Sequence, residues 1–206
     1  MIERTLSKSK ERYTFVGNRL CIDFVNTNYN PDDPAGMLHS WDDLVDFLEA
    51  ARALNRSETR RLRDICMKNP QLCAKTFAQG IVLRESLRVI LSAIQEKHRF
   101  KPEWIDAINT VLKANDGFEQ LSPRNGDWCL IFIPRHAGPM QALMPIAQSA
   151  ADLIKEGKGA PVRKCANPDC ILYFYDVSRT RRRRWCSMAV CGNRMKVAAH
   201  ARRRKP

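Results

Sequence analysis

Residues 165–191 read CANPDCILYFYDVSRTRRRRWCSMAVC, and the four cysteines of this stretch decide how the C-terminal part of the chain folds. They form two pairs, Cys165 with Cys170 and Cys186 with Cys191, and four residues separate the members of each pair. Two close pairs of thiolates joined by a loop of 15 residues supply the four tetrahedral ligands that a structural zinc ion requires. The spacing therefore predicts one structural zinc ion per chain.

The alternative is a set of free or buried thiols, and the charge of the segment argues against it. Residues 161–206 hold 13 of the 35 Lys and Arg but only 2 of the 22 Asp and Glu, which gives this segment a formal charge of +11 and leaves +2 for residues 1–160. So cationic a segment cannot build its own core, whereas zinc binding supplies about 10–16 kcal/mol toward folding. A catalytic zinc is disfavoured because four protein ligands leave no position for water.

The rest of the composition indicates a cytoplasmic protein with no membrane partner. No run of about 18 apolar residues is present, and the first residues, MIERTLSKSKER, lack the apolar core of a secretory signal. In a reducing cytosol, cysteines paired at short spacing bind metal more often than they form disulfides. The remaining four cysteines stand singly among apolar residues and are expected in the core: Cys21, Cys66, Cys73 and Cys129.

Basic side chains surround the cysteines and predict a nucleic-acid interface. Residues from Cys191 onward read as a helix whose apolar stripe, with Met195, Ala198 and Ala199, is expected to face the metal. The opposite face and the arginine loop are expected to bind phosphates, with a solvated charged surface as the alternative. The predicted contacts are Arg179, Arg181, Arg182, Arg183, Arg184, Arg194, Lys196, His200, Arg203 and Arg204.

The sequence allows two interpretations of Trp185 and two of Arg194. Trp185 either covers the metal site or stacks on a base, and its position beside a ligand favours the first. Arg194 either reads a guanine edge or braces the module through a backbone carbonyl or Asp176. His200 as a substitute ligand is disfavoured, because four cysteines already close the site.

The preceding residues predict a predominantly helical α+β domain with short β-hairpins. Helical spacing of apolar residues predicts helices over 41–54, 57–67, 73–97, from 101 onward and over 140–154. The Asn125-Gly126 turn predicts a hairpin, whose second strand is apolar on both faces and is expected to be covered by helices. The Gly17-Asn18 turn also suggests a hairpin, although Leu20 and the residues after it fit a helical stripe as well.

Gly157, Gly159 and Pro161 end the last of these helices and predict a domain boundary. The expected organisation is a helical domain over residues 1–156, a linker over 157–162, and a small zinc-finger module of zinc turns and one helix over 163–206.

The stretch from Cys165 to Arg204 resembles the CGNR zinc-finger family, whose name matches Cys191, Gly192, Asn193 and Arg194. Ile171 departs from that pattern, since a small residue is expected after the second cysteine. The segment LCIDFVNT, residues 20–27, resembles the signature of the ABATE domain, a stress-induced transcription-regulator-like domain that accompanies this finger. The resemblance implies a bacterial protein that binds zinc and, in transcription control, DNA, with no established activity or ligand.

Three functions follow from these observations. The first is a transcription regulator that binds double-stranded DNA, with an N-terminal domain that senses an unidentified effector or forms a homodimer. The second is a module that binds RNA or an acidic protein surface, because phosphate attraction alone does not identify the polymer. An enzyme is not expected, since only Asp23, Asn26 and Thr27 hint at a site and these types more often hydrogen-bond a turn or helix end.

Overall fold

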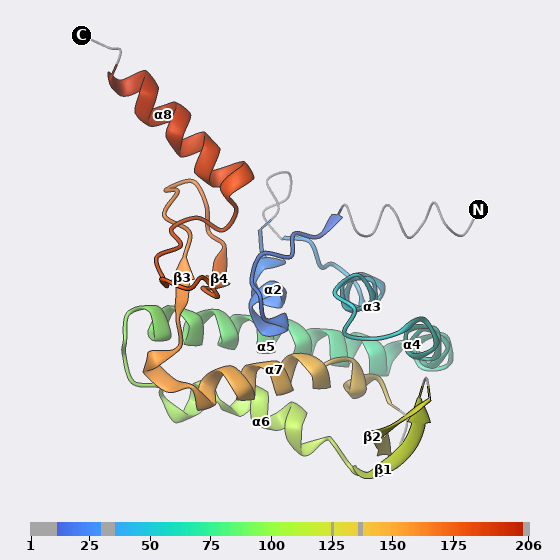
Figure 1. The fold of residues 1–206 in the computed structure, drawn as a ribbon. Coiled ribbons are helices and arrows are strands. Elements are labelled where there is room, and N and C mark those ends of the chain that lie inside the picture. Colours follow the sequence, from blue (N-terminus) through green and yellow to red (C-terminus); the bar gives the residue numbers. More distant parts are fainter. Residues whose placement is uncertain (1–11, 30–35, 125, 136–137, 204–206) are drawn as a thin grey trace.

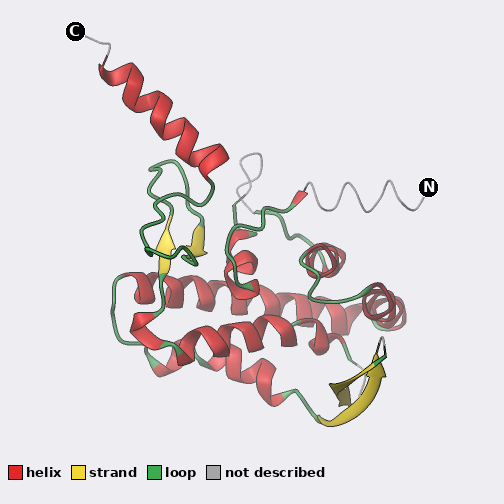
Figure 2. Ribbon diagram, in the orientation of Figure 1, coloured by secondary structure: helices red, strands yellow, loops and turns green. Residues whose placement is uncertain are grey.

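The computed structural model describes residues 12–29, 36–124, 126–135 and 138–203 of the chain. Helices form the main body, and a small C-terminal module stands on one end of it with its last helix projecting outward (Figure 1, Figure 2). The α-helices and strands are α2 (Leu20–Asn26), α3 (Trp41–Ala50), α4 (Arg56–Lys68), α5 (Pro70–Gln95), α6 (Asp106–Lys113), β1 (Gly117–Arg124), β2 (Asp127–Pro134), α7 (Met144–Lys155), β3 (Val162–Lys164), β4 (Tyr173–Tyr175) and α8 (Asn193–Arg203).

The predicted fold class is confirmed, and capping residues visible in the sequence explain where α3, α4 and α5 begin. Ser40 caps α3 by accepting a hydrogen bond from the Asp43 backbone N–H. Asn55 and Glu58 form a reciprocal capping box at the start of α4. Asn69 caps α5 ahead of Pro70, whose fixed φ suits the first helical position. Short 3₁₀ turns precede α6 and α7 (Pro102–Trp104 and Pro139–Ala142), and another follows α7 (Gly157–Gly159).

The hairpin suggested after Gly17-Asn18 is wrong, because residues 20–26 form the helix α2. This helix contacts α5, α7 and β4, and six of its seven residues are buried. A helix surrounded on all sides carries apolar residues at nearly every position, so its sequence fits an alternating pattern and a helical stripe equally well. Burial, which the sequence does not record, decides between the two.

The predicted hairpin β1–β2 is confirmed, but the expected cover of helices is wrong. The two strands are antiparallel, with Leu121 opposite Leu130. On this face Leu121, Trp128 and Leu130 are 62%, 72% and 60% exposed. The other face is half-buried at Cys129 and Ile131, so neither face of the hairpin enters the core. The apolar residues of this hairpin therefore form an exposed surface that no other described part of the chain covers.

The hairpin β3–β4 belongs to two hydrophobic cores at once. Val162 and Tyr173 are buried in the core of the helical body, with Tyr175 packed against it. Phe174, whose side chain alternates with theirs, is fully buried in a second core together with Leu172 and the four finger cysteines. The first strand of this hairpin starts within the predicted linker, so the segment after α7 packs against the body rather than spanning open solvent.

Side chains of α2 and the residues before it hold this hairpin in place. The Asn26 side-chain amide donates to the Tyr173 carbonyl at 2.9 Å and accepts from the Tyr173 N–H at 2.9 Å. The Tyr175 N–H donates to the Gly17 carbonyl at 2.8 Å. Arg19 pairs with Glu156 at 2.7 Å and lies over the Tyr175 ring. Asn26 therefore takes the place of a neighbouring strand along β4.

None of the helices in the described ranges has both the length and the apolar character needed for a transmembrane span. The prediction of core positions is confirmed for Cys21 and Cys73, which are buried, and Cys66 packs against the core. It is wrong for Cys129, which is half-buried on β2, because that hairpin stays outside the core.

We predict that Asn26→Ala lowers the free energy of unfolding by about 2–4 kcal/mol, because it leaves the buried N–H and C=O of Tyr173 without partners. Chemical denaturation of the full-length protein measures this loss. Asn28→Ala is the matched control, since that side chain is half-buried and the backbone of the residue continues the turn after α2. Equal stabilities of the two variants would contradict the role assigned to Asn26.

Candidate metal centre

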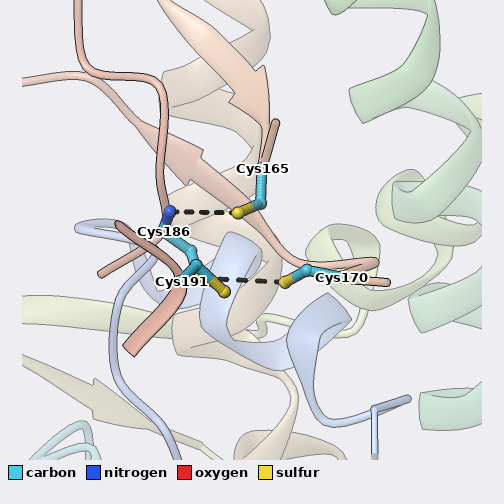
Figure 3. Close-up of side chains that lie close together, drawn as sticks. All are labelled: Cys165, Cys170, Cys186 and Cys191. Carbon is cyan, nitrogen blue, oxygen red and sulfur yellow. Dashed lines mark hydrogen bonds between the residues drawn. The ribbon is translucent and has the colours of Figure 1, made fainter. Parts of the chain in front are cut away.

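Four cysteine side chains converge at the centre of the C-terminal module (Figure 3). Cys165 follows β3 and Cys170 precedes β4, while Cys186 follows the arginine loop and Cys191 lies in a single π-helical turn, η4 (Met188–Gly192). All four are buried, and their Sγ atoms lie within 4.8 Å of one another. Among the described residues, no other group of His, Cys, Asp and Glu has this arrangement.

The geometry of the sulfur atoms fits a zinc ion. The Cys170 and Cys186 Sγ atoms are 3.8 Å apart, and those of Cys186 and Cys191 are 3.6 Å apart. Zinc–sulfur bonds of ~2.3 Å directed to the corners of a tetrahedron separate the sulfur atoms by about 3.8 Å. The four cysteines are thus able to bind one zinc ion, which would supply the cross-link that joins the two halves of the module.

Hydrogen-bond donors around the sulfur atoms favour their ionised form. The Cys186 N–H points at the Cys165 Sγ atom at 3.4 Å, and the Asn167 amide points at the Cys191 Sγ atom at 3.5 Å. The contact with Cys186 lowers the pKa of Cys170 to about 5, and the same contact raises the pKa of Cys186. Zinc binding must displace the protons of the thiols that it coordinates.

The first pair of ligands is joined by a tight turn. The Cys170 N–H donates to the Asn167 carbonyl at 3.0 Å, and the Cys165 N–H donates to the Leu172 carbonyl at 2.9 Å, which aims both thiols inward. Ile171, which departs from the family pattern, is 46% exposed. Its side chain points to solvent, so the turn accommodates it without moving either ligand.

The second pair depends on Gly192. A Cβ at this position would overlap the Met188 Sδ atom and lie 3.1 Å from Trp185 Cδ1, so a larger residue would require the exposed Met188 side chain and the Trp185 ring to shift. Trp185 is half-buried and packs against the cysteine core, with the Arg184 guanidinium 5.0 Å from its ring centre. This position supports the interpretation of Trp185 as a cover for the metal site.

Asp176 anchors the arginine loop from inside the module. Its side chain is fully buried and accepts hydrogen bonds from the Ser178 N–H and hydroxyl and from the Arg183 N–H, and it pairs with the Arg163 Nε at 3.4 Å. Burial alone would disfavour the charge, but these donors outweigh it and lower the pKa of Asp176. The carboxylate is therefore a fixed negative centre that sets the path of the loop.

The consecutive arginines differ in what they contact. Arg183 is half-buried, lies 4.3 Å from the Phe174 ring centre, and donates to the backbone carbonyls of Trp185 and Cys186. It therefore braces the second pair of ligands. The exposed members of the predicted interface in this loop are Arg179, Arg181, Arg182 and Arg184.

The prediction that the apolar stripe of helix α8 faces the metal site is wrong. The helix packs mainly against η4 and then extends away from the module, which leaves Ala199 exposed and Met195 and Ala198 only half-buried (Figure 1). Its predicted contact residues Arg194, Lys196 and His200 are exposed. Arg203 is the last residue of α8, and Arg204 falls outside the described residues.

The residues of the N-terminal signature have structural contacts. Asp23 accepts a 2.7 Å hydrogen bond from the Gly17 N–H, and burial raises its pKa to about 6 although backbone donors oppose that shift. Thr27 donates to the Phe24 carbonyl and accepts from the buried Arg84 guanidinium at 3.3 Å. Together with Asn26, these contacts shape α2 and its junction with the module, and none of them involves the four thiols.

Sequence reasoning missed three residues that support the site. Asn167 and Arg163 read as ordinary turn and strand residues, and Arg84 lies within an apolar helical stripe. A polar residue inside such a stripe was the available signal for Arg84, because a buried guanidinium needs a nearby acceptor. No local pattern pointed to Asn167 or Arg163, whose partners are distant along the chain.

Comparison with protein-family models agrees with this architecture. Residues 162–204 match the family described as CGNR zinc finger, and residues 18–157 match ABATE, described as "Putative stress-induced transcription regulator". The predicted resemblance to both families is confirmed. No curated protein matches the chain.

We predict that the purified protein contains one zinc ion per chain by elemental analysis. Cys186→Ser should lose the metal and the ordered environment of Trp185 while α3 to α7 remain helical by circular dichroism, because the ion supplies folding energy only to the module. Wild-type protein should also release zinc as the pH falls, since protons compete for the thiolates.

Cys129→Ser serves as the control, because Cys129 is half-buried on β2 and lies outside the four-thiol group. Absence of zinc from the wild-type protein, or full zinc content in Cys186→Ser, would show that the assigned ligands are wrong.

Proposed function

Because the chain belongs to the ABATE family and ends in a CGNR zinc finger, we propose that it is a zinc-containing transcription regulator that binds double-stranded DNA through the C-terminal module. The observation that carries the proposal is a set of exposed cations on a loop and a helix that one buried metal site joins. Exposed arginines that converge on one small module attract phosphate far more than scattered ones.

The arginine loop offers charge that the protein itself does not neutralise. Arg179 and Arg182 are exposed and form no ion pair with any carboxylate of the described residues. Asp176 and Arg183 fix the backbone beneath them, so little ordering is needed when a ligand binds. A fixed row of unpaired guanidinium groups suits contact with a phosphate backbone.

Helix α8 supports binding to duplex DNA in particular. It projects from the module with solvent on most sides, which is the geometry that allows a helix to enter a major groove (Figure 1). Arg194 lies in its first turn, next to the metal-anchored turn η4, and forms no hydrogen bond or ion pair within the described part of the chain. Asp176 is occupied by other donors, which favours base reading over the bracing role of Arg194.

The N-terminal domain is proposed to form a homodimer or to sense an effector. The apolar face of β1–β2, with Leu121, Trp128 and Leu130, is exposed and contiguous by register, whereas isolated exposed apolar residues are ordinary. A second copy of the chain could cover this face, and sedimentation velocity of Trp128→Ser against wild type would detect the change in mass. No effector is assigned.

We propose that the protein has no enzymatic role. We also propose that it is located in the cytoplasm of a bacterium, as the family resemblance implies. Asp23, Asn26 and Thr27 are engaged in contacts within α2 and with β4, and four thiolate ligands would leave zinc without an open position.

The second candidate function is a module that binds RNA or an acidic protein surface. Competition of duplex DNA against structured RNA, single-stranded RNA and an acidic peptide tests the choice, and preference for anything other than duplex DNA overturns the proposal.

We predict that Arg179→Ala with Arg182→Ala reduces the dependence of duplex affinity on salt. Each phosphate contact contributes about −0.9 to the slope of log affinity against log salt concentration, so the slope should become shallower by about two. Affinity should fall equally for all sequences, because backbone contacts carry no sequence information. Arg56→Ala with Arg60→Ala is the control of equal charge, on the exposed surface of α4. An unchanged slope in the loop variant would rule out phosphate contacts by this pair.

We predict a different outcome for Arg194→Ala. Its affinity for a specific site should fall by about 1–3 kcal/mol, with little change on unrelated sequences, because the loss removes a contact to a base edge. Zinc content and nonspecific binding are measured on the same preparation. Loss of zinc would instead assign Arg194 to bracing the module, and uniform weakening on all sequences would assign it to phosphate.

A further inference from the structure

A basic cleft lies where the C-terminal module meets the helical body. Its volume is about 640 Å³, and seven Lys and Arg line it while no Asp or Glu does. Three of these residues, Arg181, Arg183 and Arg184, belong to the arginine loop. The other four come from outside the loop and were not predicted to bind nucleic acid: Lys97, Lys158, Arg163 and Lys164.

The fold brings these four residues together from distant parts of the sequence. Lys97 follows the C-terminal end of α5, Lys158 lies in the 3₁₀ turn after α7, and Arg163 and Lys164 belong to β3. Strand β3 packs on α5, as Figure 1 shows above the end of that helix. The Lys97 backbone adopts the left-handed region (φ 59°), and its N–H donates to the Ile94 carbonyl at 3.1 Å.

Most of the charge in the cleft has no counterion within the protein. Lys97, Lys158 and Lys164 are exposed and pair with no carboxylate of the described residues. Arg163 is the exception, since it pairs with Asp176 and donates to the Arg181 carbonyl at 2.6 Å. Cations gathered along low-dielectric walls repel one another and raise the local concentration of anions. The cleft therefore suits an anionic ligand.

The lining indicates which phosphate-bearing ligand fits. No aromatic side chain lines the cleft, and its apolar residues are aliphatic, such as Ile94, Pro161 and Val162. Single-stranded nucleic acid is usually held by stacking its bases on aromatic rings, which are missing here. Lysine ammonium groups act as point charges on flexible stems and suit the backbone phosphates of a duplex.

We propose that this cleft binds the backbone phosphates of DNA that is held by the finger, so that the duplex runs from the arginine loop onto the helical body. The inference rests on the proposed function and extends it, because Arg181 and Arg184 belong both to the exposed loop and to the cleft wall. DNA then contacts the helical body through Lys97 and Lys158 and the C-terminal module through Arg181 and Arg184, and the β3–β4 hairpin joins these two parts. A change in how the hairpin sits on α2 and α5 would alter the DNA contacts, which gives the helical body a direct influence on binding.

The test compares two triple variants of the full-length, zinc-loaded protein that lose the same charge. Lys97→Gln, Lys158→Gln and Lys164→Gln remove the free cations of the cleft. Lys68→Gln, Lys75→Gln and Lys113→Gln remove exposed lysines from α4, α5 and α6, none of which lines the cleft. Affinity for a short mixed-sequence DNA duplex is measured across a salt series, and ATP binding is measured by calorimetry.

The expected result is a salt slope shallower by about two to three in the cleft variant, since each lost phosphate contact removes about 0.9 from it, with no such change in the control variant. Equal slopes in the cleft and control variants would overturn the inference, as would ATP binding that depends on the cleft lysines while duplex affinity does not. If Arg179→Ala with Arg182→Ala weakens duplex binding and the cleft variant does not, only the cleft inference fails. If the wild-type protein does not bind the duplex, the proposed function and the cleft inference both fail.

Discussion

The C-terminal module depends on one constraint, the gathering of four cysteine sulfur atoms within 4.8 Å of one another. Four thiolates and one zinc ion carry a net formal charge of roughly −2 in a buried site, which must be balanced by donors and cations nearby. The structure supplies both, through the N–H groups that point at sulfur and through Arg183, which donates to the carbonyl of the ligand Cys186. The positive charge beside the thiols is therefore partly a requirement of the metal site itself.

That requirement divides the arginines between two tasks. Arg183 is half-buried and bonds to backbone carbonyls, and Arg163 pairs with the buried Asp176, so the charge of both serves the fold. Arg179 and Arg182 are turned outward with no partner among the described residues, and their charge is free for a ligand. A run of like charges on such a short loop becomes tolerable once one member, Arg183, is held by backbone carbonyls and by the Phe174 ring.

The module and the helical body are coupled through a shared hairpin. Successive residues of β4 enter opposite cores, so Phe174 packs beside the ligands while Tyr173 packs beneath α2. Asn26 replaces the missing neighbouring strand with a pair of hydrogen bonds to Tyr173. The signature around α2 thus has a physical role, because Asn26 holds β4 of the finger against the helical body.

The sequence by itself determined the features whose cause is local or periodic. Two cysteine pairs were enough to predict the zinc ligands, because chelation requires only short spacing. Ser40 and the apolar repeats were enough to place α3 to α7. Tertiary structure alone decided which apolar patterns are buried, since α2 is enclosed on all sides whereas β1–β2 is not. It also decided that Asn26 contacts Tyr173 and that Lys97 lies beside β3, because such contacts join residues far apart in the chain and leave no mark on the local pattern.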